Sequence, residues 1–600
     1  MPDASPELPD PIIRERARRP EIHEALLAEG IADWLADVLA RRLERPVTVA
    51  ELYADELSAL QDPVTIPSMD VAVDRIVRAI EEGERVVFAC DHDMDGTASA
   101  AVLWTAFTRH FGVDPATLEV VTSHRLTEGY GLTAPVVARI RDLAPALVIT
   151  ADKGSSDGPR IAELAEAGID VIVTDHHELG DDGPPAAALA VVNPLREDSG
   201  YDPAICGAAV AFLVMAKTRT ALLRRGTRTA IASLADLLDY VAVATVADCV
   251  TLKPGKSPAN RLFVRRGLEQ LNQCRRPCWQ VFCEDLHGPV DAETLGFRLA
   301  PAVAAAGRLD WAEAGFLFLA AGSRREAAHQ WEILRNENTE RRAIESALRK
   351  KAFEQAAKKN GQSLVLYFED GHSGVHGITA SRLVEAFGKP SALFAPRGAG
   401  ARGDGASTDD RGPLASGSFR GVEGLHVREA LADVASRNPG LLVGFGGHAG
   451  AAGATVRVPD VDRFSAEYEA SVVRQLGKEP LRPVLEVDGE LPQDLSLQEA
   501  ADALDRLEPW GKDFPSPVFR GHFVVESVDR MGDGTHLRLA LRYGASAVRA
   551  VWFGAVASAT ARLPVAPGRR VDLLYRVRNN WFRNRKRCQL QIVRCLEDGE

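Results

Sequence analysis

Acidic residues and histidines gather at four places in the first half of the chain. In order, these are Asp91, Asp93 and Asp95, then Asp152, then Asp175, His176 and His177, and finally Asp248. Carboxylates that crowd together repel one another, which raises their pKa values and destabilises a fold. Divalent cations supply the compensating charge, and oxygen ligands with one or two imidazoles suit Mn²⁺ or Mg²⁺. Two such ions can activate a water and hold a phosphoryl oxygen, which is the chemistry of phosphodiester hydrolysis.

Short apolar runs precede these clusters and have the length and composition of buried strands. Strands are expected at residues 85–90, 146–150, 170–174 and 188–192, with helices between them at 98–110, 133–142 and 159–167. This alternation predicts right-handed crossovers and a mainly parallel sheet, whose carboxyl edge lines one crevice. The last cluster follows another apolar stretch, 237–246. We therefore expect all four clusters at strand ends and around one site.

Each cluster has a simpler explanation when it is taken alone. An Asp after a strand is often only a helix N-cap, and a His pair is more often structural than a metal ligand. We expect Asp91 to support the site from outside the ligand set. The Asp-x-Asp-x-Asp spacing is also typical of a calcium loop, but the Glu at position twelve of that loop is missing. Four clusters in this order favour a shared metal site.

Residue composition and the spacing of apolar residues divide the rest of the chain into segments. The stretch from Ser323 to Asn360 contains neither Gly nor Pro, and Ser323 with Glu326 forms a capping box, so a long helix is expected. A Gly- and Arg-rich insertion at 395–415 is expected to be mobile. Short alternating strands at 518–528, 536–541, 548–554 and 570–575 predict a small β-barrel.

The expected domains are a helical region at 1–70, an α/β domain at 71–322, a connector helix at 323–362, a second α/β domain at 363–460 and a barrel domain at 461–600.

Composition excludes several classes of protein. No apolar run is long enough for a membrane helix, and the first 20 residues lack the apolar core of a signal peptide, so we expect a cytoplasmic protein without a membrane partner. The net charge of −13 disfavours nucleic acid unless a local basic patch exists. Cys274, Cys278, Cys283 and His287 could form a zinc or iron–sulfur site, but their spacing lacks the usual pairs. A cysteine-rich helix and loop is the simpler interpretation.

The motifs resemble the DHH phosphoesterase superfamily, through Val173-Thr174-Asp175-His176-His177 after the run from Asp91 to Gly96. Further segments narrow the resemblance to the RecJ exonucleases. They are His124-Arg125, Glu128 to Leu132, Asn260-Arg261, Arg265 to Leu268, Gly377-Ile378, Ser381-Arg382, Gly446 to His448, Ala451 to Gly453 and Leu507 to Gly511. The resemblance implies the α/β fold class: a DHH parallel-sheet domain and a DHH-associated α/β domain joined by a long helix, plus a C-terminal OB-like β-barrel.

The resemblance also implies roles for individual residues. Two divalent cations, Mn²⁺ or Mg²⁺, would be held by Asp93, Asp95, Asp152, His176 and Asp248, with Asp152 as the bridge. His177 would contact the scissile phosphate, and Asp175 would orient an imidazole. Contacts to phosphate or DNA would come from Gly446, Gly447, His448, Ser381, Arg382, Arg308, Arg420, Arg125 and Tyr130, and on the barrel from Arg583, Arg585, Arg587 and Trp581.

The basic stretch near the C-terminus suits a single strand, because cations follow phosphates and aromatic rings stack on bases. A charged hairpin with a packed Trp is the alternative. The expected function is a metal-dependent exonuclease that degrades single-stranded DNA in repair and recombination, with a helicase or a single-strand-binding protein as compatible partners. The 5′→3′ direction and the 5′-mononucleotide products are implied only by the resemblance.

Two other functions stay open. A DHH phosphodiesterase acting on dinucleotides or short RNA would usually be shorter and lack the barrel. A non-catalytic scaffold would lack the acidic set.

The chain departs from the family pattern in three segments. The family usually carries Arg and Asn where this chain has Ala302 and Ala304, so DNA affinity is expected to differ. The loop before Arg420 is one residue longer than the family's. Lys153 follows the bridging Asp152 where the family more often has a small or neutral residue, and it could either contact phosphate or face solvent.

Overall fold

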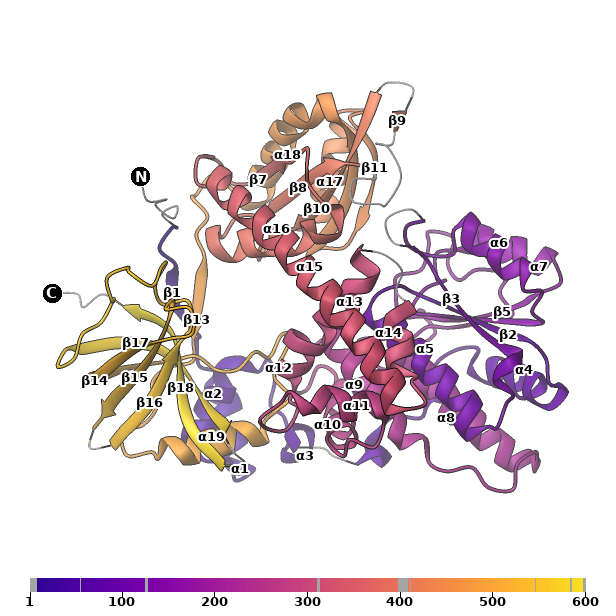
Figure 1. Cartoon of the computed structure of the whole chain (residues 1–600), viewed down its shortest axis with the longest axis horizontal. Helices are drawn as coiled ribbons and strands as arrows, with labels where there is room; N and C mark the ends of the chain where they lie inside the picture. The colour runs from indigo at the N-terminus through magenta and orange to yellow at the C-terminus, as the bar shows by residue number, and fades with distance from the viewer. Residues whose placement is uncertain are drawn as a thin grey trace.

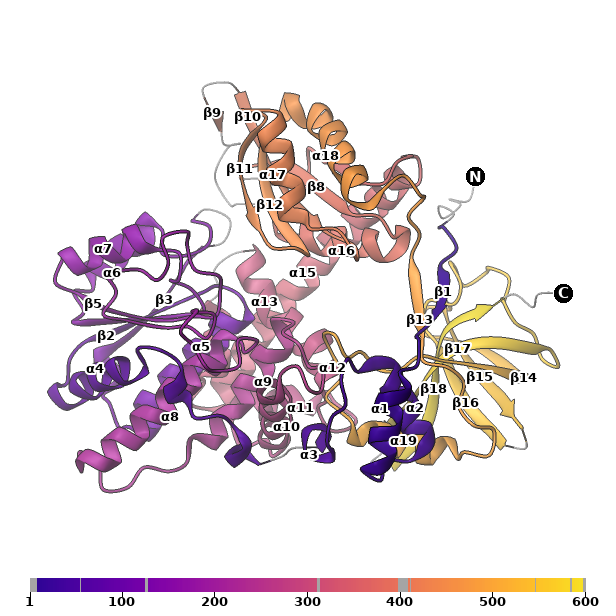
Figure 2. The same ribbon diagram turned by 180° about the vertical axis from the view of Figure 1, so that it is seen from behind.

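The computed structural model describes residues 8–53, 56–124, 128–309, 313–397, 408–409, 412–544, 546–582 and 585–596. Two α/β domains and a β-barrel make up the molecule (Figure 1). The barrel lies beside the N-terminal helices, and one long helix links the two α/β domains (Figures 1 and 2). The predicted fold class is confirmed.

The first domain is built on a five-stranded parallel sheet. Its strands are β2 (Val86–Cys90), β3 (Leu118–Thr122), β4 (Leu147–Ala151), β5 (Asp170–Thr174) and β6 (Ala190–Val192). Their order is β3-β2-β4-β5-β6, so the chain runs outward in opposite directions from the neighbouring strands β2 and β4. The carboxyl ends of such a strand pair form the usual ligand crevice of an open α/β sheet. The sequence did not reveal β3, which lies at an edge of the sheet.

Helices cover both faces of this sheet, as alternating side chains require. On one face lie α4 (Met69–Glu82), α5 (Met94–Thr105) and α8 (Gly207–Arg225), packed in one core with Phe88 and Ile149. On the other lie α6 (Ala134–Asp142) and α7 (Gly158–Glu166), packed with Val148 and Val171. Both sides of every central strand are therefore buried, which explains their continuous apolar sequences.

The stretch that precedes Asp248 is a helix, so the expectation of a strand end there is wrong. Helix α9 (Leu238–Ala247) is buried along most of its length, with Asp248 as its C-cap. An uninterrupted apolar run has no period that separates a buried strand from a buried helix, and this run has the length of a short helix. Asp248 nevertheless reaches the same site, because α9 packs against α5 and brings the Asp248 carboxylate to 3.6 Å from His176 Nε2.

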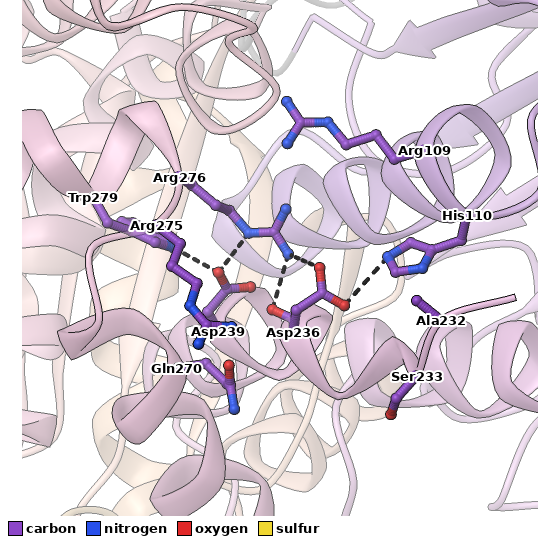
Figure 3. A pocket seen from close by; sticks show the side chains of 10 residues that line it. All are labelled: Arg109, His110, Ala232, Ser233, Asp236, Asp239, Gln270, Arg275, Arg276 and Trp279. Atoms are coloured by element: carbon purple, nitrogen blue, oxygen red, sulfur yellow. Dashed lines mark hydrogen bonds and ion pairs between the residues drawn. The ribbon is translucent and has the colours of Figure 1, made fainter.

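A buried polar network holds the far ends of α5 and α9, away from the strand ends (Figure 3). Arg276 donates through Nε to Asp239 at 2.5 Å and through a terminal nitrogen to Asp236 at 2.9 Å. His110, at the end of the turn η3 (Ala106–His110) that continues α5, lies 3.2 Å from Asp236. Trp279 donates to Asp239 at 2.6 Å. The network ties the two helices together at one end, so that the acidic residues at their other ends keep a fixed separation.

The connector is α15 (Arg324–Ala356), and Ser323 caps it by accepting from the amide of Glu326. It leads to a mixed sheet made of β7 (Leu364–Tyr367), β8 (Ser391–Pro396), β10 (Gly412–Arg420), β11 (Leu442–Gly447) and β12 (Ala451–Arg457), with the short β9 (Thr408–Asp409) beside β10. Helices α16 (Ser373–Phe387), α17 (Val427–Arg437) and α18 (Val461–Leu476) cover this sheet.

Because Phe464 and Tyr468 of α18 lie in this core, the second α/β domain extends beyond residue 460. The flanks of the insertion at 395–415 belong to β8 and β10, and β9 lies within it; residues 398–407 and 410–411 lie outside the described residues.

The barrel is closed by five strands in the order β14-β15-β16-β18-β17. They are β14 (Phe519–Met531), β15 (His536–Tyr543), β16 (Ser546–Trp552), β17 (Arg570–Phe582) and β18 (Arg585–Leu596). Helices α1 (Pro20–Ala28), α2 (Asp33–Arg42) and α19 (Leu497–Arg506) share its core. Strand β1 (Ile12–Glu15) pairs with β13 (Val484–Val487). The N-terminal helices are thus part of the barrel domain in space, which local sequence patterns could not show.

Two smaller expectations concern membranes and cysteines. In the described part of the chain, no helix is both long enough and apolar enough to cross a bilayer. Cys278 lies fully buried in the first core, and the groupings of described residues that could share a metal ion do not include the cysteines near it.

Replacement of Arg276 by Met should lower the free energy of unfolding of the first domain by about 3–5 kcal/mol, because Asp239 would stay buried without its cation. Urea denaturation of the full chain, followed by the fluorescence of Trp279, measures this. The control is Arg275→Met, whose side chain is exposed beside the same network. It should change stability by less than about 0.5 kcal/mol. Equal effects of the two substitutions would show that the network does not hold the helices.

Candidate metal centre

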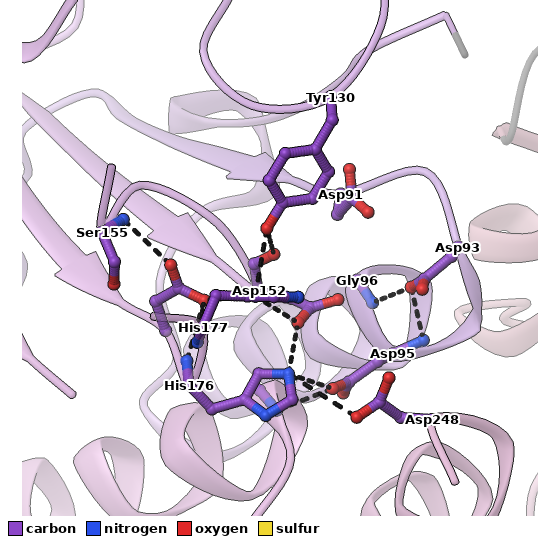
Figure 4. Close-up of polar contacts among 12 residues, drawn as sticks. Asp91, Asp93, Asp95, Gly96, Tyr130, Asp152, Ser155, His176, His177 and Asp248 are labelled. Atoms are coloured by element: carbon purple, nitrogen blue, oxygen red, sulfur yellow. Dashed lines mark hydrogen bonds and ion pairs between the residues drawn. The ribbon is translucent and has the colours of Figure 1, made fainter. Parts of the chain in front are cut away.

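The described structure brings four acidic clusters to one place, at the carboxyl ends of β2, β4 and β5 and at the end of α9 (Figure 4). Three overlapping groups have side-chain donors that all lie within 4.8 Å of one another. They are Asp152, His176 and His177; Asp95, His176 and Asp248; and Asp91, Asp93 and Asp152. All five residues expected to hold ions belong to these groups.

Backbone amides fix the first two carboxylates. Asp93 is the N-cap of α5, and its Oδ1 accepts from the amides of Asp95 at 2.9 Å and Gly96 at 3.1 Å. Asp95 accepts from the first two amides of α8, Gly207 at 2.7 Å and Ala208 at 2.8 Å. The start of a helix favours negative charge, so two helix N-termini stabilise this pair of carboxylates. A Cβ on Gly96 would lie 2.4 Å from the carbonyl oxygen of Asp91, so only glycine allows this tight turn.

Asp152 and His176 occupy the middle of the centre. His176 Nε2 lies 3.1 Å from Asp152 Oδ1, and 3.6 Å from a carboxylate oxygen of both Asp95 and Asp248. Asp152 has a left-handed backbone with φ of 61°, which Asp tolerates better than most residues. Asp152 Oδ1 and His176 Nε2 are buried and make no hydrogen bond. Buried polar atoms almost always have a partner, so these two atoms fit metal ligands.

The electrostatics point the same way. Burial and the neighbouring carboxylates raise the pKa values of Asp152 and Asp248 well above the ordinary range, and that of Asp95 also rises. Burial lowers the pKa of His176, which keeps its imidazole neutral and able to coordinate. Carboxylates in this arrangement resist ionisation until positive charge arrives, and divalent cations provide that charge. The residues present therefore fit a pair of ions.

His177 belongs to a separate hydrogen-bonded group at the edge of the centre. Its Nδ1 lies 2.8 Å from Asp175 Oδ1 and 3.0 Å from the hydroxyl of Tyr130. Burial alone would lower the pKa of His177, but the hydrogen bond with Asp175 and the nearby carboxylates raise it to about 9. Burial alone would raise the pKa of Asp175, but the same hydrogen bond lowers it to about 2. Asp175 thus orients an imidazole, the one on His177, and favours its cationic form.

Sequence reasoning missed two groups that support the centre. Asn193 follows β6 and donates to the hydroxyl of Ser155 at 2.7 Å and to the carbonyl of His177 at 2.8 Å. Its place directly after a strand, like that of Asp152, was the available signal. Gly207 begins α8 against Asp152, and nothing in the local sequence marks that contact, because it joins segments far apart in the chain.

Lys153 takes neither of the two positions considered from sequence. Its side chain is fully buried, so it does not face solvent, and its ammonium makes no hydrogen bond.

The second α/β domain faces the centre from across the molecule. His448 Nδ1 lies 3.6 Å from Glu178, and Arg428 lies 3.7 Å from the same carboxylate, which directly follows the two histidines. Arg308 donates to the carbonyl of Gly374 at the start of α16. Gly446 and Gly447 end the exposed edge strand β11 beside His448. Through His448 and Arg428, this side of the second α/β domain, named the opposite wall, lies next to the residue that follows the two histidines.

Other expected DNA contacts differ in how available they are. Ser381 donates to the carbonyl of Gly377 in its own helix, Arg382 pairs with Glu385 at 2.8 Å, and Arg420 donates to the carbonyl of Phe419. Arg125 and Arg583 lie outside the described residues.

Ion pairs occupy much of the basic stretch on the barrel. Arg578 pairs with Glu293, Lys586 with Asp502 and Asp505, and Arg594 with Asp10. Arg585 and Arg587 are exposed. Trp581 keeps 36 % of its surface exposed, while its Cβ and the adjoining ring atoms pack on Gly288. The packed Trp agrees with the alternative of a charged hairpin. Contact of the two exposed cations with DNA stays a prediction.

Gly207→Ala should weaken Mn²⁺ binding by about 10–100-fold, the usual effect of a change that displaces a ligand through its support. A Cβ at this position would lie 2.7 Å from Asp152 Cβ, so Asp152 must move. Isothermal titration of the metal-free protein with Mn²⁺ measures the change. Gly158→Ala is the matched control, because it also lies at a helix start and a Cβ there meets nothing within 4 Å. Similar affinities for the two variants would contradict the geometry described here.

Comparisons with known proteins agree with this architecture. Three family models match the chain: the DHH family N-terminal domain at residues 85–245, the DHHA1 domain at 360–474 and the RecJ OB domain at 487–594. Among curated relatives, the single-stranded-DNA-specific exonuclease RecJ of Escherichia coli is 31% identical over 96% of this chain and 98% of its own length. The protein of the same name from Dickeya dadantii is 31% identical over 97% of this chain and 99% of its own length.

Solved structures give the same result. The crystal structure of RecJ from Thermus thermophilus in complex with Mn²⁺ superposes with a TM-score of 0.76 at 26% identity, covering 98% of this chain and 80% of that one. Its likeness covers nearly the whole of this chain, and the two curated relatives named above match over nearly their full length. The chain belongs to the RecJ family of the DHH phosphoesterases.

Proposed function

We propose that this protein is a metal-dependent exonuclease that degrades single-stranded DNA. The observation that carries the proposal is the convergence of four side chains whose possible ligand atoms lie close together: Asp95, Asp152, His176 and Asp248. Asp152 Oδ1 and His176 Nε2 are also buried and make no hydrogen bond. Curated relatives with the same domain order bear the name of a single-stranded-DNA-specific exonuclease. A relative of known structure has been crystallised with Mn²⁺.

The ions would be held by Asp93, Asp95, Asp152, His176 and Asp248, with Asp152 between them. Bound there, they would supply positive charge for a phosphoryl oxygen and lower the pKa of a water. Mn²⁺ and Mg²⁺ both suit a set dominated by oxygen donors, and the imidazole favours Mn²⁺.

His177 acts on the substrate rather than on the ions. Because Asp175 holds its Nδ1, the opposite nitrogen is left to donate a hydrogen bond to a phosphoryl oxygen. Positive charge on this imidazole stabilises the negative charge that grows on phosphorus-bound oxygens during hydrolysis. Tyr130, which is about half exposed, packs edge-on against the His177 ring and keeps it in this orientation.

The strand would lie between the two α/β domains, with its end phosphate against Gly446, Gly447 and His448. Ser381, Arg382 and Arg420 would be further contacts on the second α/β domain, and Arg308 and Arg125 would be contacts on the first. The exposed Arg585 and Arg587 would guide the strand, with Arg583, and Trp581 would stack on a base. Ala302 and Ala304, which replace an Arg and an Asn, remove two polar contacts. We further propose 5′→3′ digestion to 5′-mononucleotides in repair and recombination.

Two rival functions fit less well. A phosphodiesterase for dinucleotides or short RNA has no use for the barrel, and a non-catalytic scaffold has no use for the donor set. Hydrolysis of a long single strand, compared with a dinucleotide at equal linkage concentration, separates the first rival. Dependence of any hydrolysis on added Mn²⁺ separates the second.

We place the activity in the cytoplasm, where free thiols are stable; all eight cysteines lie in the described part of the chain and none is paired. A helicase or a single-strand-binding protein that exposes or presents single strands would be a compatible partner.

Asp152→Asn should reduce the hydrolysis of end-labelled single-stranded DNA by at least about 10³-fold, because the central ligand loses its charge. Binding of the same DNA, followed by fluorescence anisotropy, should change less than about threefold, since the opposite wall and the barrel are untouched. Asp494→Asn is the control, as this exposed Asp lies far along the chain from the centre. Retention of full nuclease activity by Asp152→Asn would refute the role of this residue.

The double variant Arg585→Ala/Arg587→Ala should weaken single-strand binding and reduce the slope of log affinity against log salt by about 0.7 for each phosphate that is no longer neutralised. Arg594→Ala is the matched control on the same strand, because its charge is already balanced by Asp10. Anisotropy titrations at several salt concentrations give the slopes. If the double variant kept the slope of the parent chain, this end of the barrel would not contact the DNA backbone.

A further inference from the structure

A hollow of about 340 Å³ opens beside the buried polar network that holds the far ends of α5 and α9 (Figure 3). The residues that line it come from the end of η3, from the segment around η5 (Leu234–Leu237), and from α10 (Pro258–Asn272), α11 (Pro277–Glu284) and the turn between them. Helix α5 and η3 together run from Met94 to His110, so the hollow lies about 25 Å from the acidic residues at the start of α5. It is therefore separate from the metal centre.

The guanidinium of Arg276 is fixed in this hollow, and one of its nitrogens is left over. Only 7 % of the side chain is exposed. Its Nε donates to Asp239 and one terminal nitrogen donates to Asp236, while the guanidinium carbon lies 4.5 Å from the centre of the Tyr240 ring. The other terminal nitrogen donates to no residue in the described ranges and points away from both carboxylates (Figure 3). Buried donors almost always have an acceptor, so the hollow offers a rigid pair of N–H groups to its occupant.

Two further arginines line the same hollow. Arg109 and Arg275 are exposed, and neither forms an ion pair with a residue that the structure describes. In Figure 3 the guanidinium of Arg109 lies on the side toward which the remaining nitrogen of Arg276 points. Gln270 adds an uncharged amide to the lining. Three guanidinium groups thus surround one small space.

The two carboxylates of the lining are already balanced and do not repel an anion as free carboxylates would. Asp239 accepts from Arg276 at 2.5 Å and from the indole of Trp279 at 2.6 Å. Asp236 accepts from Arg276 at 2.9 Å and lies 3.2 Å from His110. The charges of Arg109 and Arg275 are therefore in surplus.

These groups match a phosphate, because guanidinium groups donate several charge-assisted hydrogen bonds to phosphate oxygens. A single DNA strand would be a poorer match, since such strands need rings on which their bases stack. Trp279 is fully buried with its N–H on Asp239, and the lining contains no exposed Trp, Tyr or Phe among the described residues. The hollow therefore suits the phosphate group of a small molecule.

We propose that this hollow is an anion site for inorganic phosphate or a phosphate monoester, and that the bound anion strengthens the network between α5 and α9. The phosphate oxygens accept from Arg276 inside the hollow and from Arg109 and Arg275 around it. Because Arg109 belongs to η3 and the other two arginines to the turn between α10 and α11, one anion joins both segments. The proposal goes beyond the proposed function and does not depend on nuclease activity.

The test is isothermal titration of the full-length protein with inorganic phosphate, after divalent ions have been removed on a chelating resin. Arg109→Ala/Arg275→Ala should weaken phosphate binding at least about tenfold, because two charges that attract the dianion are lost. The matched control is Arg141→Ala/Arg224→Ala, which removes two exposed arginines of the same domain that form no ion pair with a described residue. The control should bind phosphate like the parent chain.

Two further measurements identify the ligand and its effect. Thymidine 5′-monophosphate is titrated beside inorganic phosphate, and the tighter of the two names the source of the phosphate group; thymidine alone should not bind. Phosphate should also raise the melting temperature of the parent chain and of the control, measured by circular dichroism, and should raise that of Arg109→Ala/Arg275→Ala by less.

Four results would overturn the proposal. They are the absence of phosphate binding by the parent chain, equal phosphate binding by Arg109→Ala/Arg275→Ala, binding of thymidine as tight as that of its monophosphate, and an equal rise in melting temperature in all three proteins. If the same double variant bound single-stranded DNA more weakly but phosphate normally, the hollow would be a DNA contact instead. A parent chain that binds phosphate here but cleaves no DNA would refute the proposed function and leave this inference standing.

Discussion

Negative charge is concentrated at the carboxyl edge of the first sheet, where water cannot screen it. Asp95 and Asp152 are almost wholly buried, and their neighbours raise their pKa values. An arrangement of this kind is unstable by itself, so other parts of the fold must hold it in place. Helix N-termini provide amides to Asp93 and Asp95, and the packing of α5 against α9 fixes the distance between their acidic ends. Cations complete the balance when they bind.

The negative charge of the centre also determines what the other two domains must contribute. A centre that needs cations attracts a polyanion only after they have bound, and the opposite wall then has to supply donors for the remaining phosphate charge. His448 and Arg428 already lie within 3.7 Å of Glu178 on the side of the centre, so the two walls approach one another without substrate. The barrel adds exposed cations to a chain whose overall charge is −13. Acids balance Arg578, Lys586 and Arg594, whereas Arg585 and Arg587 stay exposed.

Much of the fold could be predicted from the sequence because its strands are short, apolar and followed by charged residues. The centre was equally visible, since every ligand but one follows a strand. Asp248 was assigned to the centre, but the element before it was predicted wrongly as a strand, because an apolar run of ten residues fits a buried helix as well as a strand. The burial of Lys153, the contact of Gly207 with Asp152 and the packing of the N-terminal helices on the barrel all depend on segments far apart in the chain. No local pattern reports such contacts. The ion pairs of Arg578 and Lys586 were hidden for the same reason, so the basic stretch looked more available than it is.

The most direct measurement is diffraction from crystals of the full chain soaked in Mn²⁺, recorded at the manganese absorption edge. Two anomalous peaks should appear about 3.5–4 Å apart, one on each side of the Asp152 carboxylate, with Asp93, Asp95, His176 and Asp248 around them. A map without anomalous density among these residues, or with cations bound only on the outer surface, would contradict the account.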